Sequence, residues 1–335
     1  MAELVAVVVT YNRLDKLRVT LERLLAHAPE ELSRVVVLDN ASEDGTGAWL
    51  AAQDAPRLTV LRQPENLGGA GGFEQAMRET VARFDPDWLV LMDDDARPEA
   101  GTLPAFHARA RDSHAAWAAA VYYPSGRICD MNRPWINPFR SVKGFVQTLL
   151  RGRNGFHMGA AEYAGTRLQD IDGGSFVGLF LSRAGIQAAG YPDGRLFLYG
   201  DDVLYTLGLS QAGGRVGFDP GLRFEHDCET LAEAAPKVMQ PLWKVYYFHR
   251  NQVLVYRRAA GPLLFWPVLA LRALGWWRRA GAYGAQKRLY QRLIRLALQD
   301  GLARHLDRPR SEILALSSGS ECRDESGASG SDQAP

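Results

Sequence analysis

The chain has 335 residues, of which 47% are hydrophobic, and its 39 lysine and arginine residues nearly balance its 38 aspartate and glutamate residues. This length fits one large domain or two fused units, and the composition excludes collagen-like, coiled-coil and wholly disordered chains. A net charge of +1 gives no overall attraction to nucleic acid, so we expect no nucleic-acid partner. The cysteines Cys129, Cys228 and Cys322 are widely spaced. That spacing argues against a disulfide scaffold or a cysteine zinc site and favours a reducing compartment.

No targeting or membrane-spanning segment is expected. The N-terminus leads directly into the apolar run LVAVVV, without a basic region or a small-residue cleavage site. The most membrane-like stretch, residues 262–277, has 16 residues and includes Arg272 and two prolines. It is shorter than the ~20 apolar residues that a spanning helix needs.

The first hundred residues alternate between the hydrophobic periods of strands and helices. Short apolar runs predict buried parallel strands at residues 4–9, 35–38, 58–62 and 88–92. Helices are predicted at residues 14–27, 44–53 and 71–84. This alternation predicts an α/β fold with a mostly parallel central sheet flanked by helices.

The second half of the chain has a less regular pattern. Residues 116–122 predict a strand, whereas residues 123–165 mix Gly, Pro, Asn and Arg and are expected to form a long loop, of the kind that serves as a lid or binds substrate. Further elements are predicted at residues 174–181, 183–189, 201–211, 215–218 and 285–305.

Three consecutive aspartates, Asp93, Asp94 and Asp95, follow the strand predicted at residues 88–92. Ligands of open parallel sheets bind beyond the carboxyl ends of the strands. Clustered carboxylates repel one another unless a cation compensates, and aspartates two positions apart in extended backbone point to the same side. Asp93 and Asp95 are therefore candidate ligands for Mg²⁺ or Mn²⁺, with a solvated acidic turn as the alternative.

Three other polar loops follow the remaining early strands, with the sequences TYNR at residues 10–13, DNAS at 39–42 and NLGGAGGF at 66–73. Asp39 can accept hydrogen bonds from a nucleobase or ribose, and the glycines let backbone approach a ligand without a Cβ in the way. None of these loops matches the P-loop pattern, and GGAGG differs from GxGxxG. Four polar loops at one sheet edge predict a ligand site there.

In this order and spacing, VVVTYNR, VVVLDNASEDGT, NLGGAGGF and LVLMDDDARPE resemble a family-2 glycosyltransferase. The catalytic domain of that family has the nucleotide-diphosphosugar-binding α/β fold called GT-A. NLGGAGGF combined with three aspartates is most similar to the galactofuranosyltransferases and their rhamnosyltransferase relatives. The resemblance runs from residue 4 to about residue 251 and continues weakly to residue 307.

The resemblance implies a role for each loop. The nucleotide-sugar donor would be held by Thr10, Tyr11, Arg13, Asp39, Asn66, Gly69 and Asp94. Asp93 and Asp95 would be the metal-binding DxD pair, where Mn²⁺ or Mg²⁺ neutralises the diphosphate leaving group. The reaction would be inverting: an acceptor hydroxyl attacks opposite the departing nucleotide and a carboxylate takes its proton.

The paired acids Asp201 and Asp202 resemble the family's acidic pair, which would make Asp202 the catalytic base and Asp201 its orienting or acceptor-binding neighbour. Helix capping is the structural alternative. Gly200 stands where the galactofuranosyltransferases carry a bulky aromatic residue, a departure that weakens the assignment of the sugar more than that of the reaction.

Two more segments are similar to the same relatives. His226 matches the position of a third metal ligand, and a neutral imidazole beside two carboxylates suits Mn²⁺. Asp172, Gly173 and Gly174 resemble the acceptor-side loop beneath the donor sugar, with a structural turn as a nearly equal alternative. Residues 243–251 resemble a YYxxRN element to which the sequence assigns no role.

The implied function is transfer of galactofuranose from UDP-galactofuranose to a glycan or lipid-linked acceptor in cell-surface polysaccharide synthesis. The expected location is the cytoplasm or the inner face of the plasma membrane. A dTDP-rhamnose donor is the alternative within the class. A nucleotidyltransferase would ordinarily need a Gly-rich loop with Lys or Arg after the first strand, and TYNRLDK is not such a loop. A non-catalytic nucleotide- or carbohydrate-binding scaffold has no reason to keep clustered acids.

The C-terminal region is basic, with 14 lysine and arginine residues against two aspartates between residues 243 and 310. Basic helices with aromatic anchors lie on anionic membranes, so residues 261–295 are a candidate for peripheral membrane association. A homo-oligomer interface or a solvated basic face is the alternative. We expect a catalytic domain at residues 1–240, a helical basic and aromatic region at 241–310 and a disordered tail at 311–335.

Overall fold

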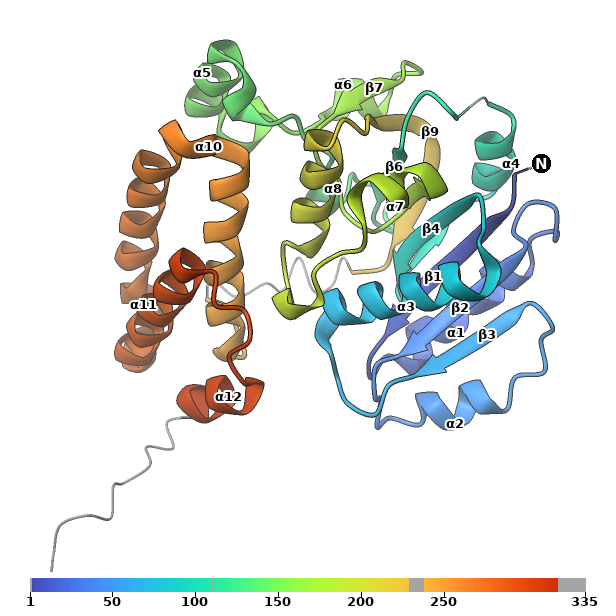
Figure 1. The fold of residues 1–335 in the computed structure, drawn as a ribbon, viewed down its shortest axis with the longest axis horizontal. Helices are drawn as coiled ribbons and strands as arrows, with labels where there is room; N and C mark the ends of the chain where they lie inside the picture. Colours follow the sequence, from blue (N-terminus) through green and yellow to red (C-terminus); the bar gives the residue numbers. More distant parts are fainter. Residues whose placement is uncertain (1, 110, 229–237, 319–335) are drawn as a thin grey trace, which may run out of the picture.

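A mixed nine-stranded β-sheet forms the centre of the computed structural model, which describes residues 2–109, 111–228 and 238–318 (Figure 1). The strands run in the order β3-β2-β1-β4-β8-β6-β9-β5, and β7 pairs with β9. Their bounds are β1 Leu4–Thr10, β2 Arg34–Asp39, β3 Leu58–Arg62, β4 Trp88–Asp93, β5 Ala96–Pro98, β6 Ala116–Tyr122, β7 Gln169–Ile171, β8 Leu179–Ser182 and β9 Val216–His226.

The four predicted early strands are confirmed and are parallel to one another. Beyond β4 the sheet changes character, because β8 pairs antiparallel with both β4 and β6, whereas β6 and β9 are parallel. The parallel half therefore brings the carboxyl ends of β1, β2 and β4 to one edge. In the other half, β9 also ends at that edge, where His226 pairs with Ala96 of β5.

Helices cover both faces of the sheet. Alternate side chains of β1 point to opposite faces, as the strand period requires. Leu4, Ala6 and Val8 pack with α1 (Leu14–Leu25), α2 (Thr46–Ala51) and α4 (Thr102–His107). Val5, Val7 and Val9 pack with α3 (Gly68–Phe84), α7 (Arg183–Ala189) and α8 (Asp201–Gln211). Because both faces are covered, the functional groups of the strands lie at the strand ends.

The long loop expected at residues 123–165 is wrong in part, because this segment contains α5 (Val142–Arg151) and α6 (Ala160–Tyr163), together with the short 3₁₀ helices η1 (Asp130–Asn132), η2 (Pro138–Arg140) and η3 (Gly152–Gly155). Ser141 caps α5 by accepting a hydrogen bond from the Gly144 amide at 3.0 Å. The apolar residues of α5 recur at helical spacing, but the Gly, Pro and Arg residues on either side favoured the prediction of a loop.

The C-terminal region is helical, as expected. It comprises α10 (Trp243–Arg279), the 3₁₀ segment η5 (Ala280–Gln286), α11 (Lys287–Ala303) and α12 (Arg310–Ser318). Gly261 divides α10 into two halves at a φ of 65°. By length and composition, one helical stretch within the described residues, Trp243–Ala303, could cross a membrane.

The predicted disordered tail needs a correction. Residues 310–318 form α12, which buries Ile313 in the same core as α10 and α11. Ile313 anchors this helix, and Leu316 packs against the same core. Residues 319–335 of the predicted tail lie outside the described residues.

Candidate active site

The predicted strand-end residues meet at one edge of the sheet. Thr10 pairs with Asp39 in the register between β1 and β2, and Val9 pairs with Asp93 between β1 and β4. The Thr10 hydroxyl donates a 2.8 Å hydrogen bond to Asp94. Tyr11, directly after β1, stays exposed. Parallel pairing therefore places the first two predicted loops beside the three aspartates.

His226 joins this cluster through the short strand β5. Directly after the aspartates, β5 pairs antiparallel with β9, and Ala96 lies opposite His226. The imidazole Nε2 lies 3.0 Å from an oxygen of Asp95. Ligand atoms of Asp93, Asp95 and His226 all lie within 4.8 Å of one another. Two carboxylates and an imidazole at this spacing form a donor set that fits Mn²⁺.

Cationic side chains offset the buried negative charge of this cluster. Arg13 donates a hydrogen bond to Asp95 and lies 3.6 Å from Asp94. Burial would lower the pKa of His226, but the hydrogen bond to Asp95 outweighs it and raises that pKa to about 10. Burial raises the pKa of Asp94 to about 7, against the opposing charge of Arg13. In the absence of a metal ion, an imidazolium and a guanidinium therefore balance the carboxylates.

The second ring nitrogen of His226 has its own partners. Nδ1 lies 2.7 Å from the side-chain oxygen of Asn132, which also accepts from the Cys129 thiol at 2.9 Å. Cys129, Cys228 and His226 form a further group with ligand atoms within 4.8 Å of one another. The spacing of the cysteines gave no sign of this proximity. Asn132 was also missed, since η1 lies in the segment expected to be a loop.

The Asp39 carboxylate is fully buried at the end of β2. One oxygen accepts from the Ser42 amide at 2.9 Å, while the other has no hydrogen-bond partner and lies 3.7 Å from Arg62. A buried acceptor without a donor is unfavourable unless a ligand supplies one. Asp39 therefore remains available to a nucleoside.

The neighbouring Asn40 organises the Gly-rich loop, a role that sequence reasoning missed. Its amide donates to Gly68 O at 2.9 Å and to Asn66 at 3.1 Å, and its oxygen accepts from the Leu67 amide. Asn66, predicted to bind the donor, also accepts from the Gly68 amide at 2.7 Å. These hydrogen bonds hold the loop in its observed conformation.

Most glycines of this loop make room for protein rather than for a ligand. A Cβ on Gly68, whose φ is 72°, would lie 2.0 Å from Phe197 O, and one on Gly71 would meet Leu67. Gly69 differs, because the nearest atom to its Cβ position is Leu198 Cδ1 at 4.0 Å. The Gly-rich loop therefore packs against the segment that leads into the paired acids.

Those acids begin α8 after a strained turn. Phe197, Tyr199 and Gly200 have φ values of 64°, 71° and 78°, a conformation that only glycine adopts without strain. Burial raises the pKa of Asp201 to about 8 and, despite a hydrogen bond from the Val203 amide, that of Asp202 to about 6. The charge of Asp93 contributes to both shifts.

The YYxxRN-like element holds this turn in place. The Asn251 amide donates to the carbonyls of Leu196, Leu198 and Tyr199 at 2.8–3.0 Å. Arg250 donates to Leu196 O at 2.9 Å, and both side chains are fully buried. The sequence identified the element but gave no sign of this function.

Asp172, Gly173 and Gly174 have structural partners. The Asp172 carboxylate accepts hydrogen bonds from the backbone N–H of Asn137 at 2.8 Å, from the Ser210 hydroxyl at 3.2 Å and from Arg140. A Cβ on Gly173 would lie 2.2 Å from the Trp135 ring. The structure assigns packing roles to these residues, and their binding of acceptor stays a prediction.

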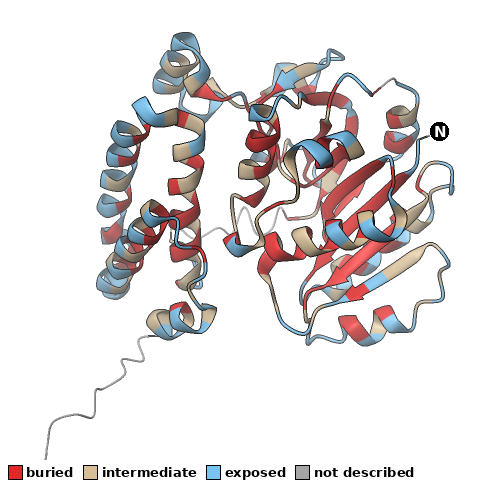
Figure 2. Cartoon of the chain, viewed as in Figure 1, coloured by how far each residue is buried: buried red, intermediate tan, exposed pale blue. Residues whose placement is uncertain are grey.

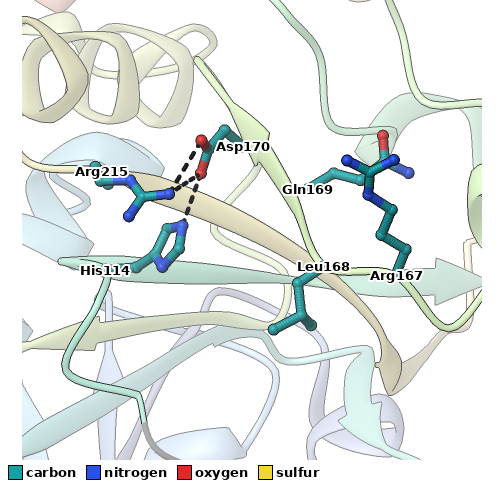
Figure 3. Close-up of a pocket in the computed structure, with 6 residues that line it drawn as sticks. All are labelled: His114, Arg167, Leu168, Gln169, Asp170 and Arg215. Carbon is teal, nitrogen blue, oxygen red and sulfur yellow. Dashed lines mark hydrogen bonds and ion pairs between the residues drawn. The ribbon is translucent and has the colours of Figure 1, made fainter.

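Two cavities lie at different distances from the acidic residues of the site. One of about 370 Å³, lined by His114, Arg167, Leu168, Gln169, Asp170 and Arg215, lies at β7 (Figure 3). There Asp170 already pairs with His114 at 2.8 Å and with Arg215 at 3.0 Å. Gly217, opposite Asp170, is nine residues from His226 along β9, roughly 30 Å of extended strand. This cavity is remote from the metal-ligand cluster.

The second cavity, of about 570 Å³, lies between α10 and η5. Tyr199, two residues before Asp201, lines it, as do Phe248, Trp276, Arg272 and Arg279. Aromatic rings and arginines are suited to stacking on sugars and to binding anionic groups. This cavity therefore adjoins the paired acids on the side of the C-terminal helices.

A family profile described as Glycosyl transferase family 2 matches residues 5–171. Residues 5–171 therefore form a glycosyltransferase family 2 domain. It is 28% identical over 225 residues to galactofuranosyltransferase GlfT1 of Mycolicibacterium smegmatis, an alignment that covers 67% of this chain and 71% of that relative. The predicted family and the enzyme class, glycosyltransferase, are confirmed.

Solved glycosyltransferases share the fold. S. aureus TarS 1–349 in complex with UDP-GlcNAc matches with a TM-score of 0.51 at 16% identity, covering 95% of this chain and 92% of that one. GalNAc-T7 with UDP, GalNAc and Mn²⁺ matches with a TM-score of 0.55 at 12% identity, covering 92% of this chain and 59% of that one. These likenesses confirm the GT-A fold and, at such identities, show the fold alone.

Proposed function

We propose that this glycosyltransferase moves galactofuranose from UDP-galactofuranose, with inversion, onto a glycan or lipid-linked acceptor in cell-surface polysaccharide synthesis. The observation that carries the proposal is the grouping of Asp93, Asp95 and His226 at the strand ends as a possible metal site. The charge of Asp93 also helps to raise the pKa of Asp202. Similarity to GlfT1 supports the sugar. Nucleotide sugars are made in the cytoplasm, so we expect the enzyme to act there or on the inner face of the plasma membrane.

The donor is held by residues at the ends of β1, β2 and β4. Asp39 offers a buried acceptor without a hydrogen-bond partner, and Thr10, Tyr11, Arg13, Asn66, Gly69 and Asp94 surround the same edge. The Mn²⁺ in GalNAc-T7 and the donor set of this chain support a divalent cation at Asp93, Asp95 and His226. Mn²⁺ or Mg²⁺ there would neutralise the diphosphate of the leaving nucleotide.

The acceptor approaches from the side of α8. Asp202 is half-buried and has a pKa raised to about 6, and it takes the proton of the attacking hydroxyl. Asp201 orients Asp202 or binds the acceptor. The aromatic cavity beside Tyr199 provides a surface on which acceptor sugars can stack. Because Asn251 fixes the turn before α8, the base is positioned before the acceptor binds.

A dTDP-rhamnose donor is the second candidate, favoured by Gly200. Its φ of 78° lies in the left-handed region that favours glycine, so the aromatic residue that galactofuranosyltransferases carry there would be strained in this turn. A different donor sugar is one reason for such a change.

Calorimetry with UDP, dTDP, GDP and CDP, with and without Mn²⁺, tests the donor on wild type and Asp95→Asn. We expect Mn²⁺-dependent UDP binding that the variant loses. Turnover with UDP-galactofuranose and with dTDP-rhamnose then decides the sugar. Preference for dTDP would favour rhamnose, and no Mn²⁺-dependent nucleotide binding would refute the proposed site.

A further inference from the structure

The outer side of the C-terminal helices carries an apolar stripe that no part of the described structure covers. In the second half of α10, Phe265, Leu269 and Trp276 face inward and are buried. On the outer side, Leu263 and Trp266 are 88% and 62% exposed, and Leu274 and Trp277 continue the stripe. A helix that is apolar all round is normally covered on every side.

The helix α5 presents a second exposed apolar face. Val142, Val146, Leu149 and Leu150 recur at helical spacing, and three of them are 70–82% exposed. No residue of α5 is buried. An amphipathic helix gains most of its stability by burying its apolar face, so this face lacks the partner that its pattern calls for.

The two apolar faces belong to neighbouring parts of the structure. Directly before α5, the Asn137 side chain donates to Ala259 O at 2.9 Å, two residues from the bend of α10 at Gly261. Figure 1 shows α5 beside that bend, where the second half of α10 begins with Leu263 and Trp266. Figure 2 shows exposed residues along both helices.

The positive charge around these apolar faces indicates what kind of partner would cover them. Residues 131–161 contain five lysine or arginine residues, and residues 243–299 contain eleven, yet neither segment contains an aspartate or glutamate. Lys143 and Arg151 of α5 and Arg278 of α10 are exposed beside the apolar side chains. Basic side chains bordering exposed Leu and Trp match the interface of an anionic bilayer, in which Trp prefers the headgroup level.

We propose that α5 and the outer face of the second half of α10 form one surface that docks on an anionic lipid bilayer. The helices lie in the interface, with Leu149, Leu150, Leu263 and Trp266 inserted. Lysine and arginine side chains contact lipid phosphates. This inference adds α5 to the C-terminal segment named from the sequence and does not depend on the identity of the donor sugar.

Flotation of the full-length protein with vesicles tests this surface, using phosphatidylcholine alone and phosphatidylcholine mixed with phosphatidylglycerol. We expect binding to the mixed vesicles that weakens with added salt. Leu149→Gln with Leu150→Gln, and separately Leu263→Gln with Trp266→Gln, should each weaken partitioning at least about tenfold. Lys143→Gln with Arg151→Gln should weaken binding to the mixed vesicles alone.

Val19→Gln on α1 and Val60→Gln on β3 are matched controls, because they replace side chains that are 44% and 37% exposed elsewhere. They should bind like wild type. Unchanged circular dichroism and nucleotide binding in every variant separate loss of docking from unfolding and from failure of the donor site. Vesicle binding equal to wild type in the α5 pair would overturn the proposal. So would a wild-type dimer that both pairs convert to monomer without change in vesicle binding, since a second copy would then be the occupant.

Discussion

His226 and Asp95 lie 131 positions apart in the chain, yet Nε2 of the imidazole is 3.0 Å from a carboxylate oxygen of Asp95. The antiparallel pairing of β5 with β9 creates this contact. On the other side of the ring, Asn132 accepts from Nδ1 at 2.7 Å and donates to Ser175 at 2.9 Å. Asn132 therefore fixes the orientation of the ring and leaves Nε2 directed at Asp95, where it can itself serve as a metal ligand.

Replacing Asn132 should weaken metal binding without removing a ligand. We expect Asn132→Leu to raise the Kd for Mn²⁺ about 10–100-fold, because partners of metal-binding imidazoles have effects of that size. Asn132→Asp keeps the acceptor and should stay close to wild type. Mn²⁺ titration followed by electron paramagnetic resonance measures both values, and equal Kd values in the two variants would contradict the positioning role.

Metal binding should release a proton. The pKa of His226 is raised to about 10 by its hydrogen bond to Asp95, which outweighs burial, so Mn²⁺ must displace a proton from Nε2 at neutral pH. We expect the affinity for Mn²⁺ to rise about tenfold per pH unit from about pH 6 to pH 9. Calorimetry in buffers of different ionisation enthalpy counts the released protons. His226→Gln should bind more weakly and with a flatter pH dependence, and proton release undiminished in this variant would place the titrating group elsewhere.

Asp202→Asn should reduce turnover strongly while leaving donor binding intact. General-base catalysis contributes about 10²–10⁴-fold, so kcat should fall by that factor. Because burial raises the pKa of Asp202 to about 6, kcat/KM of the wild type should fall below about pH 6, where the carboxylate becomes protonated. Steady-state rates measured across the acid range test this fall in kcat/KM, and calorimetry with UDP tests donor binding. Full activity in Asp202→Asn would transfer the role of base to another group.

Asp201→Asn should stabilise the metal-free protein at alkaline pH. Burial and the neighbouring Asp202 raise the pKa of Asp201 from 3.8 to about 8. The protonated form is therefore favoured by folding, and its stabilising contribution is lost as pH rises through about 8. We expect the variant to melt a few degrees above wild type at pH 8 and close to it at pH 4. Calorimetric scans in chelator measure the difference, and a gain that is independent of pH would rule out titration as its cause.

The early α/β unit could be predicted because each element is encoded locally. The strand at Leu4–Thr10 is a continuous apolar run, α1 repeats leucine at helical spacing, and the polar residues follow directly at the strand ends. Parallel pairing then leaves little freedom in where Thr10, Asp39 and Asp93 can meet. Motif order and spacing were enough to identify the family, since those loops hold its characteristic residues.

The rest depended on contacts between distant segments. Nothing near Asn132 in sequence signals that it orients His226, because its partners follow from where η1 lies against β9. Nothing in the sequence of α10 distinguishes Asn251 from its polar neighbours, and only the fold shows that it binds the turn before α8. Gly68 likewise makes room for the Phe197 carbonyl rather than for a ligand. The amphipathic pattern of α5 is local, but only the tertiary structure shows that its apolar face is left uncovered. The sequence alone determined the early strands and helices and the chemistry at the ends of those strands. Tertiary packing decided which polar side chains support that chemistry, because hydrogen bonds between distant segments leave no periodic pattern in the chain.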